Sequence, residues 1–499
     1  MKQRETFKSR LGFLLLSAGC AIGIGNVWRF PYVVGQNGGG AFVLFYVLFL
    51  AIMGVPVLSM EFAVGRASRK SPVKAYQQLE PKGSKWHLHG YVALFGNYVL
   101  MMFYTTVAGW MMYYFYSFLT GKFTGMTSEM VNASFGEMLA SPGTNVFWMI
   151  VVVIMGIIVC SRGLQSGVEK ITKNMMLCLL CLMVILAVRG ISLEGGTEGL
   201  KFYLYPDFAK MKEVGIGNVI VAAMNQSFFT LSLGIGAMAI FGSYLEKEHT
   251  LLGEAVNVAI LDTFVAFTAG LIIFPACFAF GVNPDSGPSL IFITLPNVFI
   301  SMAGGRVWGT LFFLFMFFAA FSTVLAVFEN IIACDMELFE IDRKKSAYIN
   351  LVLIILLSLV ALLSLYALFH QVFQRKPLLQ SIGIFQRFIS DGLHGFHSEK
   401  AHMGGDEHIR ERRKPCQILI PNDLIRAVFI EQPFFLFIYI QAYSPEFSRQ
   451  KPFNQGSRIH QSPSGGVYQV DPFFHTFYGF FIDDMTGLLR ERAVQRDEV

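Results

Sequence analysis

An apolar segment near the N-terminus contains residue types that interrupt a helix. Residues 19–31 read GCAIGIGNVWRFP, with three glycines, an arginine and a proline. Glycine and proline break a helix there, and the backbone N–H and C=O groups that are freed cannot face lipid. They must face protein or a wet cavity, and unwound stretches of this kind form ion and substrate sites at mid-membrane depth.

A second segment of the same kind lies farther along the chain. Residues 225–236 read NQSFFTLSLGIG and repeat the Gly-Ile-Gly of residues 23–25. The two interrupted segments are five helices apart, so their halves of the chain cross the membrane in opposite directions, as in an inverted repeat with the site at its interface. Glycines that only allow close helix packing are the alternative, but a Gly-Ile-Gly in both segments favours the breaks.

The composition places these segments in an integral membrane protein. The 499 residues are 54% hydrophobic and 15% charged, with a mean hydropathy of +0.52, whereas soluble domains carry about 25% charged residues. The net charge of +5 gives no indication of nucleic-acid binding, and the sequence has no Walker A, GxSxG or HExxH motif, so we do not expect an enzyme. Cys178 and Cys181 form a CxxC without a second pair, and we interpret the cysteines as small packing residues.

Nine segments are long and apolar enough to cross a bilayer, which takes about 20 residues of helix. They are residues 11–34 and 219–241, which are interrupted, and residues 41–65, 90–119, 146–160, 168–188, 255–281, 307–334 and 349–369. Residues 288–303 are apolar but too short to cross, and we expect a lid-like outer loop there. Lysine and arginine gather at the N-terminus and after even numbers of crossings, which places the N-terminus in the cytoplasm.

The chain changes character after the ninth segment. From residue 374 to residue 499 it has no long apolar span, and seven of the ten histidines lie at or beyond His370. We therefore divide the chain into a transmembrane domain of nine helices, residues 1–369, and an aberrant tail, residues 370–499. We interpret the tail as the product of a shifted reading frame or as a poorly ordered segment, with a genuine soluble domain as the alternative.

Several motifs together resemble the neurotransmitter:sodium symporter family. They are the first break, the NGGG turn at residues 37–40, the ExxxGR at residues 61–66 and the NQSFFTLSLGIGAM at residues 225–238. The resemblance covers about residues 4–367 and is nearest to the bacterial amino-acid branch. It implies an all-α membrane protein with the LeuT-like inverted repeat, in which helices 1 and 6 are broken at mid-membrane. The family has ten core helices, and since no tenth is recognisable here, we expect the second repeat to be incomplete after helix 9.

The resemblance implies two sodium sites, and the residue types suit a hard cation that prefers oxygen ligands. The first site would use the Ala21 carbonyl, Asn26, Thr230 and Asp262 together with the carboxylate of the substrate. The second would use the carbonyls of Gly19, Ile22 and Ala319 and the hydroxyls of Ser322 and Thr323. Ordinary interhelical hydrogen bonds are the alternative for the polar residues of the first site, and hydroxyl bonds to the preceding turn are the alternative for those of the second.

Asp262 is informative because an ionisable group inside a membrane span is costly and usually functional. Chloride-dependent members of the family bind the anion with groups that match Tyr46 and Gln226 and with a serine, but this chain has Ala266 at the serine position. The Asp262 carboxylate would supply the fixed negative charge instead. We therefore expect no chloride requirement, with proton coupling through Asp262 left open and a purely structural pairing as the alternative.

The substrate class follows from Gly23, where amine transporters of the family place an aspartate. A glycine leaves room for a substrate that brings its own carboxylate, which would meet the N–H groups of the first break and the hydroxyl of Tyr104. We expect an amino acid with a hydrophobic or aromatic side chain, and an ordinary packing role is the alternative for Tyr104. The resemblance implies a substrate site formed by Cys20, Ala21, Gly23, Gly25, Leu100, Tyr104, Phe229, Thr230, Ser232, Ile235, Ala326 and Val327.

The resemblance also implies gates on both sides of the site. Tyr104 and Phe229 correspond to an aromatic lid. Arg29 corresponds to the arginine of the outer gate, with snorkelling to an interface as the alternative, and its usual aspartate partner on helix 10 is not found here. On the cytoplasmic side the matching residues are Arg4, Tyr244 and Glu337, with Phe7 in place of the usual tryptophan and Glu61 as a buried structural carboxylate.

Together these observations favour a sodium-coupled, chloride-independent symporter of a hydrophobic or aromatic amino acid. It would work by alternating access in a plasma membrane, that of a bacterium, with helices 1, 2, 6 and 7 rocking against helices 3, 4 and 8. The expected partners are sodium, a small amino acid and the lipid bilayer, without nucleic acid. A channel or non-transporting receptor on the same scaffold and a truncated, transport-inactive product are the alternatives.

Overall fold

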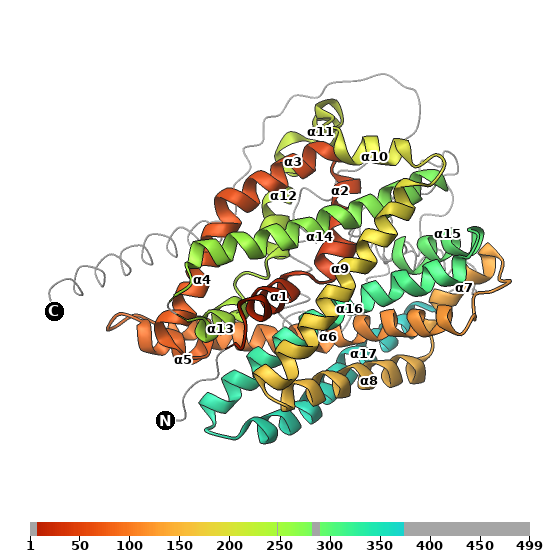
Figure 1. The fold of residues 1–499 in the computed structure, drawn as a ribbon. Helices are drawn as coiled ribbons and strands as arrows, with labels where there is room; N and C mark the ends of the chain where they lie inside the picture. Colours follow the sequence, from red (N-terminus) through yellow and green to blue (C-terminus); the bar gives the residue numbers. More distant parts are fainter. Residues whose placement is uncertain (1–6, 247, 282–289, 374–499) are drawn as a thin grey trace, which may run out of the picture. The chain divides into compact units, whose positions relative to one another are not determined.

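The computed structural model describes residues 7–246, 248–281 and 290–373, and these ranges are almost wholly helical (Figure 1). An isolated β-bridge joins Gly39 to Pro206. The α-helices are α1 (Arg10–Ala21), α2 (Phe30–Gln36), α3 (Gly40–Phe49), α4 (Val55–Ser68), α5 (Pro72–Leu79), α6 (His87–Leu119), α7 (Ser128–Leu139), α8 (Pro142–Ser161), α9 (Lys170–Ile191), α10 (Thr197–Leu204), α11 (Phe208–Val214), α12 (Ile216–Thr230), α13 (Ala237–Tyr244), α14 (Leu251–Ala279), α15 (Leu295–Ser301), α16 (Gly305–Leu338) and α17 (Arg343–Phe373). The π-helical turns are η1 (Gly25–Arg29), η2 (Leu50–Gly54), η3 (Leu164–Glu169) and η4 (Leu290–Thr294).

Each of the nine predicted membrane segments coincides with one continuous helical stretch or with one interrupted pair. Among the described residues, seven helices are long and apolar enough to cross a membrane, and the bent pair of α1 with η1 and α2 makes an eighth. The remaining segment is the pair of α12 and α13, which have 15 and 8 residues. The predicted all-helical membrane fold is therefore confirmed, and residues 290–301 form a helix too short to cross, as expected.

The first break lies between Ala21 and Gly25. Helix α1 ends at Ala21, and Ile22 adopts an extended backbone with φ −72° and ψ 95°. The chain returns to helical geometry as a π-helical turn at Gly25, and the two halves are bent by 53°. Pro31 lies just after this turn and removes one N–H donor from the ladder. The interruption predicted from glycine and proline is thus present.

The second break lies between Thr230 and Ala237. Gly234 and Gly236 have φ angles of +87° and +74°, in the left-handed region that glycine adopts without steric cost. Ser232 also lies in this region, with φ +52°, which is uncommon for a residue with a side chain. The second Gly-Ile-Gly therefore provides the backbone conformation that stops α12 and starts α13.

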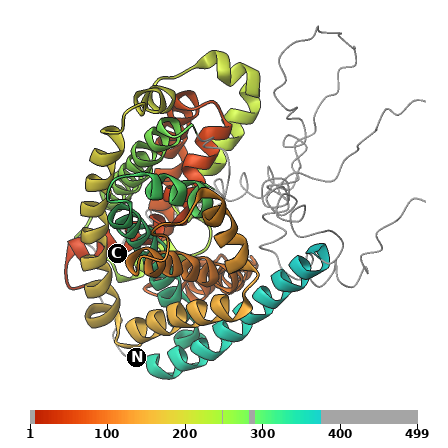
Figure 2. The same cartoon turned by 90° about the vertical axis from the view of Figure 1, so that its right-hand side faces the viewer.

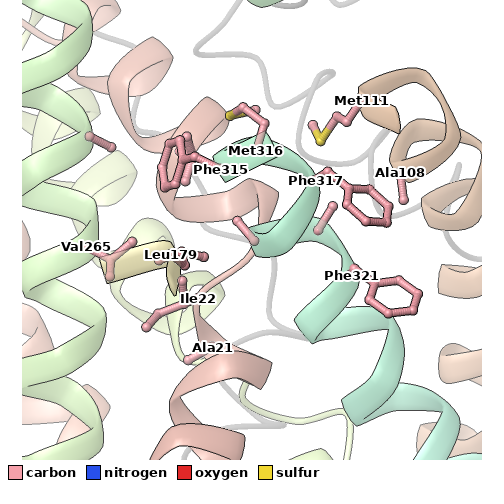
Figure 3. Packing of buried hydrophobic residues seen from close by; sticks show 14 of the residues in the cluster. Ala21, Ile22, Ala108, Met111, Leu179, Val265, Phe315, Met316, Phe317 and Phe321 are labelled. Atoms are coloured by element: carbon pink, nitrogen blue, oxygen red, sulfur yellow. The ribbon is translucent and has the colours of Figure 1, made fainter. Parts of the chain in front are cut away.

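Helix α16 passes beside both breaks and packs against α1, α6, α8, α9 and α13. Figure 3 shows Phe317 of α16 beside Ala108 of α6, with Ala21 and Ile22 of the first break on the other side of α16. Helix α17 lies along α8 and α6 (Figure 2). A backbone contact joins α13 to α4, since a Cβ on Gly65 would lie within van der Waals overlap of the backbone of α13.

The cysteines and the C-terminal tail are the remaining features about which the sequence led to expectations. Cys178 and Cys181 are exposed on α9, so the prediction that they pack inside is wrong, whereas Cys20, Cys160, Cys277 and Cys334 are buried. The sequence could not reveal this because a lipid-facing helix is apolar on its outer face as well as on its inner one. The tail predicted at residues 370–499 lies outside the described residues, apart from the end of α17.

Candidate functional site

Three side chains predicted for the first sodium site meet between η1, α12 and α14. Asn26 Nδ2 donates to Asp262 Oδ1 at 2.7 Å and to Thr230 Oγ1 at 3.2 Å. Thr230 Oγ1 donates to Asp262 Oδ2 at 2.8 Å. All three residues are buried. A buried carboxylate with two further polar oxygens beside it suits a hard cation.

The Asn26 amide also ties this cluster to the first break. Its Oδ1 accepts a hydrogen bond from the Gly23 N–H at 3.3 Å, and its Nδ2 also donates to the Asp262 carbonyl oxygen at 3.2 Å. Ala21, whose carbonyl is the fourth predicted ligand, is the last residue of α1. One side chain thus satisfies a backbone group freed by the break and links that break to α14.

The second predicted sodium site brings the first break and α16 together. Ser322 Oγ donates to the Ile22 carbonyl at 3.2 Å and to the Ala319 carbonyl at 2.9 Å. Thr323 Oγ1 lies 3.5 Å from the Gly19 carbonyl oxygen. The bond to Ala319 is the bond to the preceding turn that was the alternative, but the other contacts reach a different helix. All five predicted groups therefore gather, and the hydroxyls can rotate to present lone pairs to a cation.

Tyr104 reaches the backbone of the first break. Its Oη accepts a hydrogen bond from the Ile24 N–H at 3.2 Å. A Cβ on Gly23 would lie 2.5 Å from Thr323 Oγ1 and 2.7 Å from Tyr104 Oη. Gly23 thus lies beside the Tyr104 hydroxyl, which is predicted to bind the substrate, and the Thr323 hydroxyl, which is predicted to bind sodium. The short distances leave no room for a side chain at this position.

The two breaks are joined to each other next to the remaining predicted substrate residues. Ser232 Oγ donates to the Cys20 carbonyl oxygen at 3.1 Å. This bond fixes the left-handed residue of the second break against the end of α1. The other predicted lining residues are Leu100 and Ile235, which are half-buried, and Ala326 and Val327, which are buried.

Arg29 and Phe229, which are predicted for the outer gate and the lid, contact each other directly. The guanidinium carbon of Arg29 lies 4.1 Å from the centroid of the Phe229 ring, a cation–π contact. Arg29 Nη1 also donates to Gln226 Oε1 at 2.8 Å. A Cβ on Gly25 would lie 2.9 Å from the Phe229 ring. The ring is therefore held between the first break and the arginine, with 39% of the residue exposed.

The residues at the chloride positions of the family are all buried. Gln226 Nε2 has no hydrogen-bond partner among the described residues. Tyr46 Oη lies close to Asp262, and in the described part of the chain it too has no partner at hydrogen-bonding geometry. Of the two potential anion donors, Tyr46 therefore lies near a buried carboxylate, and the apolar Ala266 stands in place of a serine.

The predicted cytoplasmic gate residues take partners that the sequence did not indicate. Tyr244 Oη donates to Glu329 Oε1 at 2.8 Å, and Glu329 forms an ion pair with Arg343 at 2.7 Å. Glu337 Oε2 accepts hydrogen bonds from the N–H and the hydroxyl of Ser71, at 2.8 Å and 2.7 Å. The structure thus places Tyr244 and Glu337 in two polar clusters that join α16 to different neighbours.

Three further residues complete the predicted gates. Arg4 lies outside the described residues. Phe7 packs edge-to-face on the Tyr244 ring, with 5.7 Å between the centroids. Glu61 is buried and accepts a hydrogen bond from the Gly234 N–H at 2.6 Å. This carboxylate therefore supports the second break, in agreement with a structural role.

Sequence reasoning missed several polar residues that face the breaks or the gate. Asn97 Nδ2 and Asn330 Nδ2 donate to the Ile235 carbonyl oxygen at 2.8 Å and 3.4 Å. Glu329 was missed as well. Each is a polar residue inside a long apolar helix, and that signal could have identified them, because such residues are costly unless they have a partner or a function.

Comparisons with known proteins agree with this geometry. The model of the Sodium:neurotransmitter symporter family matches residues 4–135 and 123–374. The uncharacterized sodium-dependent transporter YhdH of Bacillus subtilis is 35% identical over 351 residues, which are 70% of this chain and 77% of that protein. An uncharacterized sodium-dependent transporter of Haemophilus influenzae is 34% identical over 359 residues, 70% of this chain and 78% of its own length. The crystal structure of MhsT in complex with L-phenylalanine is similar with a TM-score of 0.68 and 37% identity, over 78% of this chain and 87% of that one.

Proposed function

This chain belongs to the sodium:neurotransmitter symporter family, and we propose that it carries a hydrophobic or aromatic amino acid inward together with sodium, without a need for chloride. Members of this family are membrane transporters rather than enzymes, and its relatives are sodium-dependent. The substrate class, the two sodium ions and the chloride independence are the parts of the proposal that go beyond family membership.

One observation supports the proposal most: polar side chains gather on two sides of the first break. Asn26, Thr230 and Asp262 form one cluster on its side toward α14, and the hydroxyls of Ser322 and Thr323 form another on its side toward α16. The second cluster includes the carbonyls of Gly19 and Ile22, which a regular α1 would keep in its own hydrogen-bond ladder. Two sodium ions held by these clusters would therefore bind only while the helix is broken.

The same geometry explains how sodium and the amino acid would be coupled. The carboxylate of the substrate would complete the sodium shell beside Asn26 and would be held by the N–H groups of the break and by Tyr104. Each ligand then raises the affinity of the other by the same factor, since coupling free energy is reciprocal. A substrate without a carboxylate would leave the first site short of one ligand and would not be carried.

The substrate class is inferred from the walls of the site. Ala326 and Val327 are buried on α16, Leu100 and Ile235 are half-buried, and Phe229 is partly exposed. These side chains are apolar, and two of them are small, which suits a bulky apolar group. MhsT, the structural relative at 37% identity, was crystallised with L-phenylalanine, which is of the same class.

Chloride independence is inferred from the charge beside Tyr46. In this chain the carboxylate of Asp262 lies near the Tyr46 hydroxyl and is bonded to Asn26 and Thr230. A fixed negative charge at this place balances the charge of a bound sodium ion, as a bound chloride would do. A second anion beside Asp262 would meet like-charge repulsion, so we expect none to bind there.

The proposal is tested by reconstituting the full chain in lipid vesicles and imposing a sodium gradient. Uptake of labelled tyrosine, tryptophan, phenylalanine and leucine is compared with uptake of labelled glycine and serotonin, in chloride and in gluconate media. We expect sodium-dependent accumulation of the bulky apolar amino acids, equal in both media. Preference for serotonin, or accumulation without sodium, would refute the proposal.

The same vesicles separate the alternatives. A symporter preloaded with unlabelled amino acid exchanges it for labelled amino acid outside, whereas a channel gives no counterflow. A receptor on this scaffold binds the amino acid in a sodium-dependent way but does not accumulate it, and an inactive product does neither. Counterflow with sodium-dependent accumulation is the outcome that the proposal requires.

A further inference from the structure

The Ile235 carbonyl in the second break receives hydrogen bonds from two different helices. Asn97 Nδ2 of α6 donates at 2.8 Å and Asn330 Nδ2 of α16 donates at 3.4 Å. Both asparagines are buried, at 0% and 1% exposure. A break in a membrane helix leaves carbonyls without a helical partner, and these must be satisfied by protein or water. This carbonyl is satisfied by two amides that face it from separate helices.

The preceding residue of the break is held by a third helix. The Gly234 N–H donates to Glu61 of α4 at 2.6 Å. Helix α4 is helix 2 of the family and belongs with helix 6 to the group expected to rock, and the close contact of α4 with α13 at Gly65 agrees with this. Helices α6 and α16 are helices 3 and 8, which belong to the other group. Adjacent backbone groups are therefore bonded to the two parts that move relative to each other.

The two asparagines also lie close to the predicted substrate residues. Asn97 precedes Tyr104 by seven residues, which places both on one face of α6, about 10 Å apart along its axis. Asn330 follows Val327 by three residues, one turn along α16. The carbonyl that they share belongs to Ile235, which is itself predicted to line the site. The amides therefore lie one layer beyond the substrate residues and need not touch the substrate.

The hydrogen bonding of Asn97 argues against a packing role. Its Nδ2 donates to both the Ala93 and the Ile235 carbonyl oxygens, and its Oδ1 has no partner among the described residues. The opposite amide orientation would place Oδ1 against two carbonyl oxygens, so the orientation follows from these bonds. A buried acceptor without a partner costs stability, and leucine would fill a similar volume without that cost. We infer that an asparagine stands at position 97 because its Nδ2 group donates hydrogen bonds.

We propose that Asn97 and Asn330 are positioning residues for the substrate site, and that they act jointly through their hydrogen bonds to the Ile235 carbonyl. They hold the unwound part of helix 6 against α6 and α16, and this contact must be released when the two groups of helices separate. The proposal rests on the proposed function, because it assigns the effect to amino-acid binding beside the second break. Sodium ligands are not touched by either side chain in the described structure, so the effect is specific to the amino acid.

The test uses Asn97→Leu, Asn330→Leu and the double variant in the full-length chain, with uptake in vesicles at saturating sodium. Either amide alone still satisfies the carbonyl, whereas the double variant leaves it without a donor. We expect each single variant to raise the KM for the amino acid about threefold and the double variant to raise it about 30-fold or more, beyond the product of the single effects. The maximal rate per folded protein and the half-saturating sodium concentration for binding without amino acid should stay within about twofold.

A matched control is Thr105→Val combined with Ser358→Ala. These residues are buried and share a hydrogen bond of 3.1 Å between α6 and α17. The control removes a buried interhelical bond from the same helix without touching the second break. We expect it to lower the melting temperature about as much as the asparagine variants do, and to leave KM unchanged.

The outcomes distinguish this proposal from the proposed function. If the wild type accumulates amino acids and the asparagine variants keep its KM, or lose rate and affinity to the same extent, the positioning role is wrong while the proposed function stands. Wild-type vesicles without sodium-driven uptake would overturn both. If the double variant does not fold, the single variants decide, because a raised KM at constant maximal rate supports the proposal and an unchanged KM in both overturns it.

Discussion

Replacing Asp262 by asparagine is the sharpest test of how charge is arranged in the candidate site. The carboxylate accepts one bond from Asn26 and one from Thr230, and it is fully buried. An asparagine can keep its oxygen toward Asn26 and donate from its amide to the Thr230 hydroxyl oxygen, so the local structure should survive. What disappears is the negative charge near the first predicted sodium ion.

The magnitude follows from Coulomb's law. A sodium ion about 4 Å from the carboxylate gains about 4 kcal/mol at an effective dielectric constant of about 20, which corresponds to roughly three orders of magnitude in affinity. Relaxation and water reduce this figure, and we expect uptake by Asp262→Asn in chloride-free medium to need about 100-fold more sodium. Chloride bound by the donors of Tyr46 and Gln226 would restore the missing charge, so adding chloride should recover most of the uptake.

The assay measures the sodium dependence of labelled phenylalanine uptake in chloride and in gluconate. Asp335→Asn is the matched control, since Asp335 is a buried carboxylate in α16 that accepts bonds from Tyr98 and Asn350. Its neutralisation should leave uptake equal in the two media. A wild type that needs chloride, or an Asp262→Asn variant whose uptake is equally low in both media, would show that the reasoning about Asp262 is wrong.

Three other substitutions test the packing of the site. Gly23→Ala places a methyl group 2.5 Å from Thr323 Oγ1, so sodium-stimulated binding of phenylalanine should fall at least tenfold while the protein stays folded in size-exclusion chromatography. Glu329→Gln removes one charge of the ion pair with Arg343. Breaking a buried pair costs about 3–5 kcal/mol, so the melting temperature should fall. A melting temperature within about 1 °C of wild type would contradict this expectation. Gly65→Val forces α4 and α13 apart and should lower thermal stability, whereas the same substitution at Gly96, where a Cβ would have open space, should not.

The breaks could be predicted from the sequence because their causes are local. Glycine permits the left-handed angles at Gly234 and Gly236, and Pro31 removes a donor from the ladder wherever it stands. The same applies to the long apolar helices, whose lengths are set by the bilayer. Fold class and the positions of the breaks therefore follow from residue types within about ten residues of each feature.

The contacts of the site could be anticipated only through the family resemblance. Asn26, Thr230 and Asp262 are separated by 204 and 32 residues along the chain, and no periodicity within one helix reports a partner on another. The family resemblance predicted that these three residues belong to one site. It did supply Glu337 on the same helix, but not Glu329 or its ion pair with Arg343, because neither of these two residues belongs to a motif that carried the resemblance.

Polar residues inside the apolar helices can be understood as the counterparts of the two breaks. Each break frees backbone groups inside an apolar segment, and three of the freed N–H groups have a side-chain oxygen as partner. The Gly23 N–H has the Asn26 oxygen, the Ile24 N–H has Tyr104, and the Gly234 N–H has Glu61. Replacing Asn26 by an apolar residue of similar size would leave the buried Gly23 N–H unpaired, at a cost of about 1–3 kcal/mol.

This cost explains why the partners come from elements outside the broken segments as well as from within them. A partner on the same segment, such as Asn26, shapes the break and fixes it in space only through its own further bonds, here to Thr230 and Asp262. Partners on α4, α6 and α16 fix the second break relative to three helices at once. Because α4 belongs to the group expected to rock and α6 and α16 to the other, the bonds to α4 can persist through a transport cycle, whereas those to α6 and α16 must be exchanged. Among the polar residues on α6 and α16, those that bond to a break are therefore the ones at which substitutions should change the KM for the amino acid.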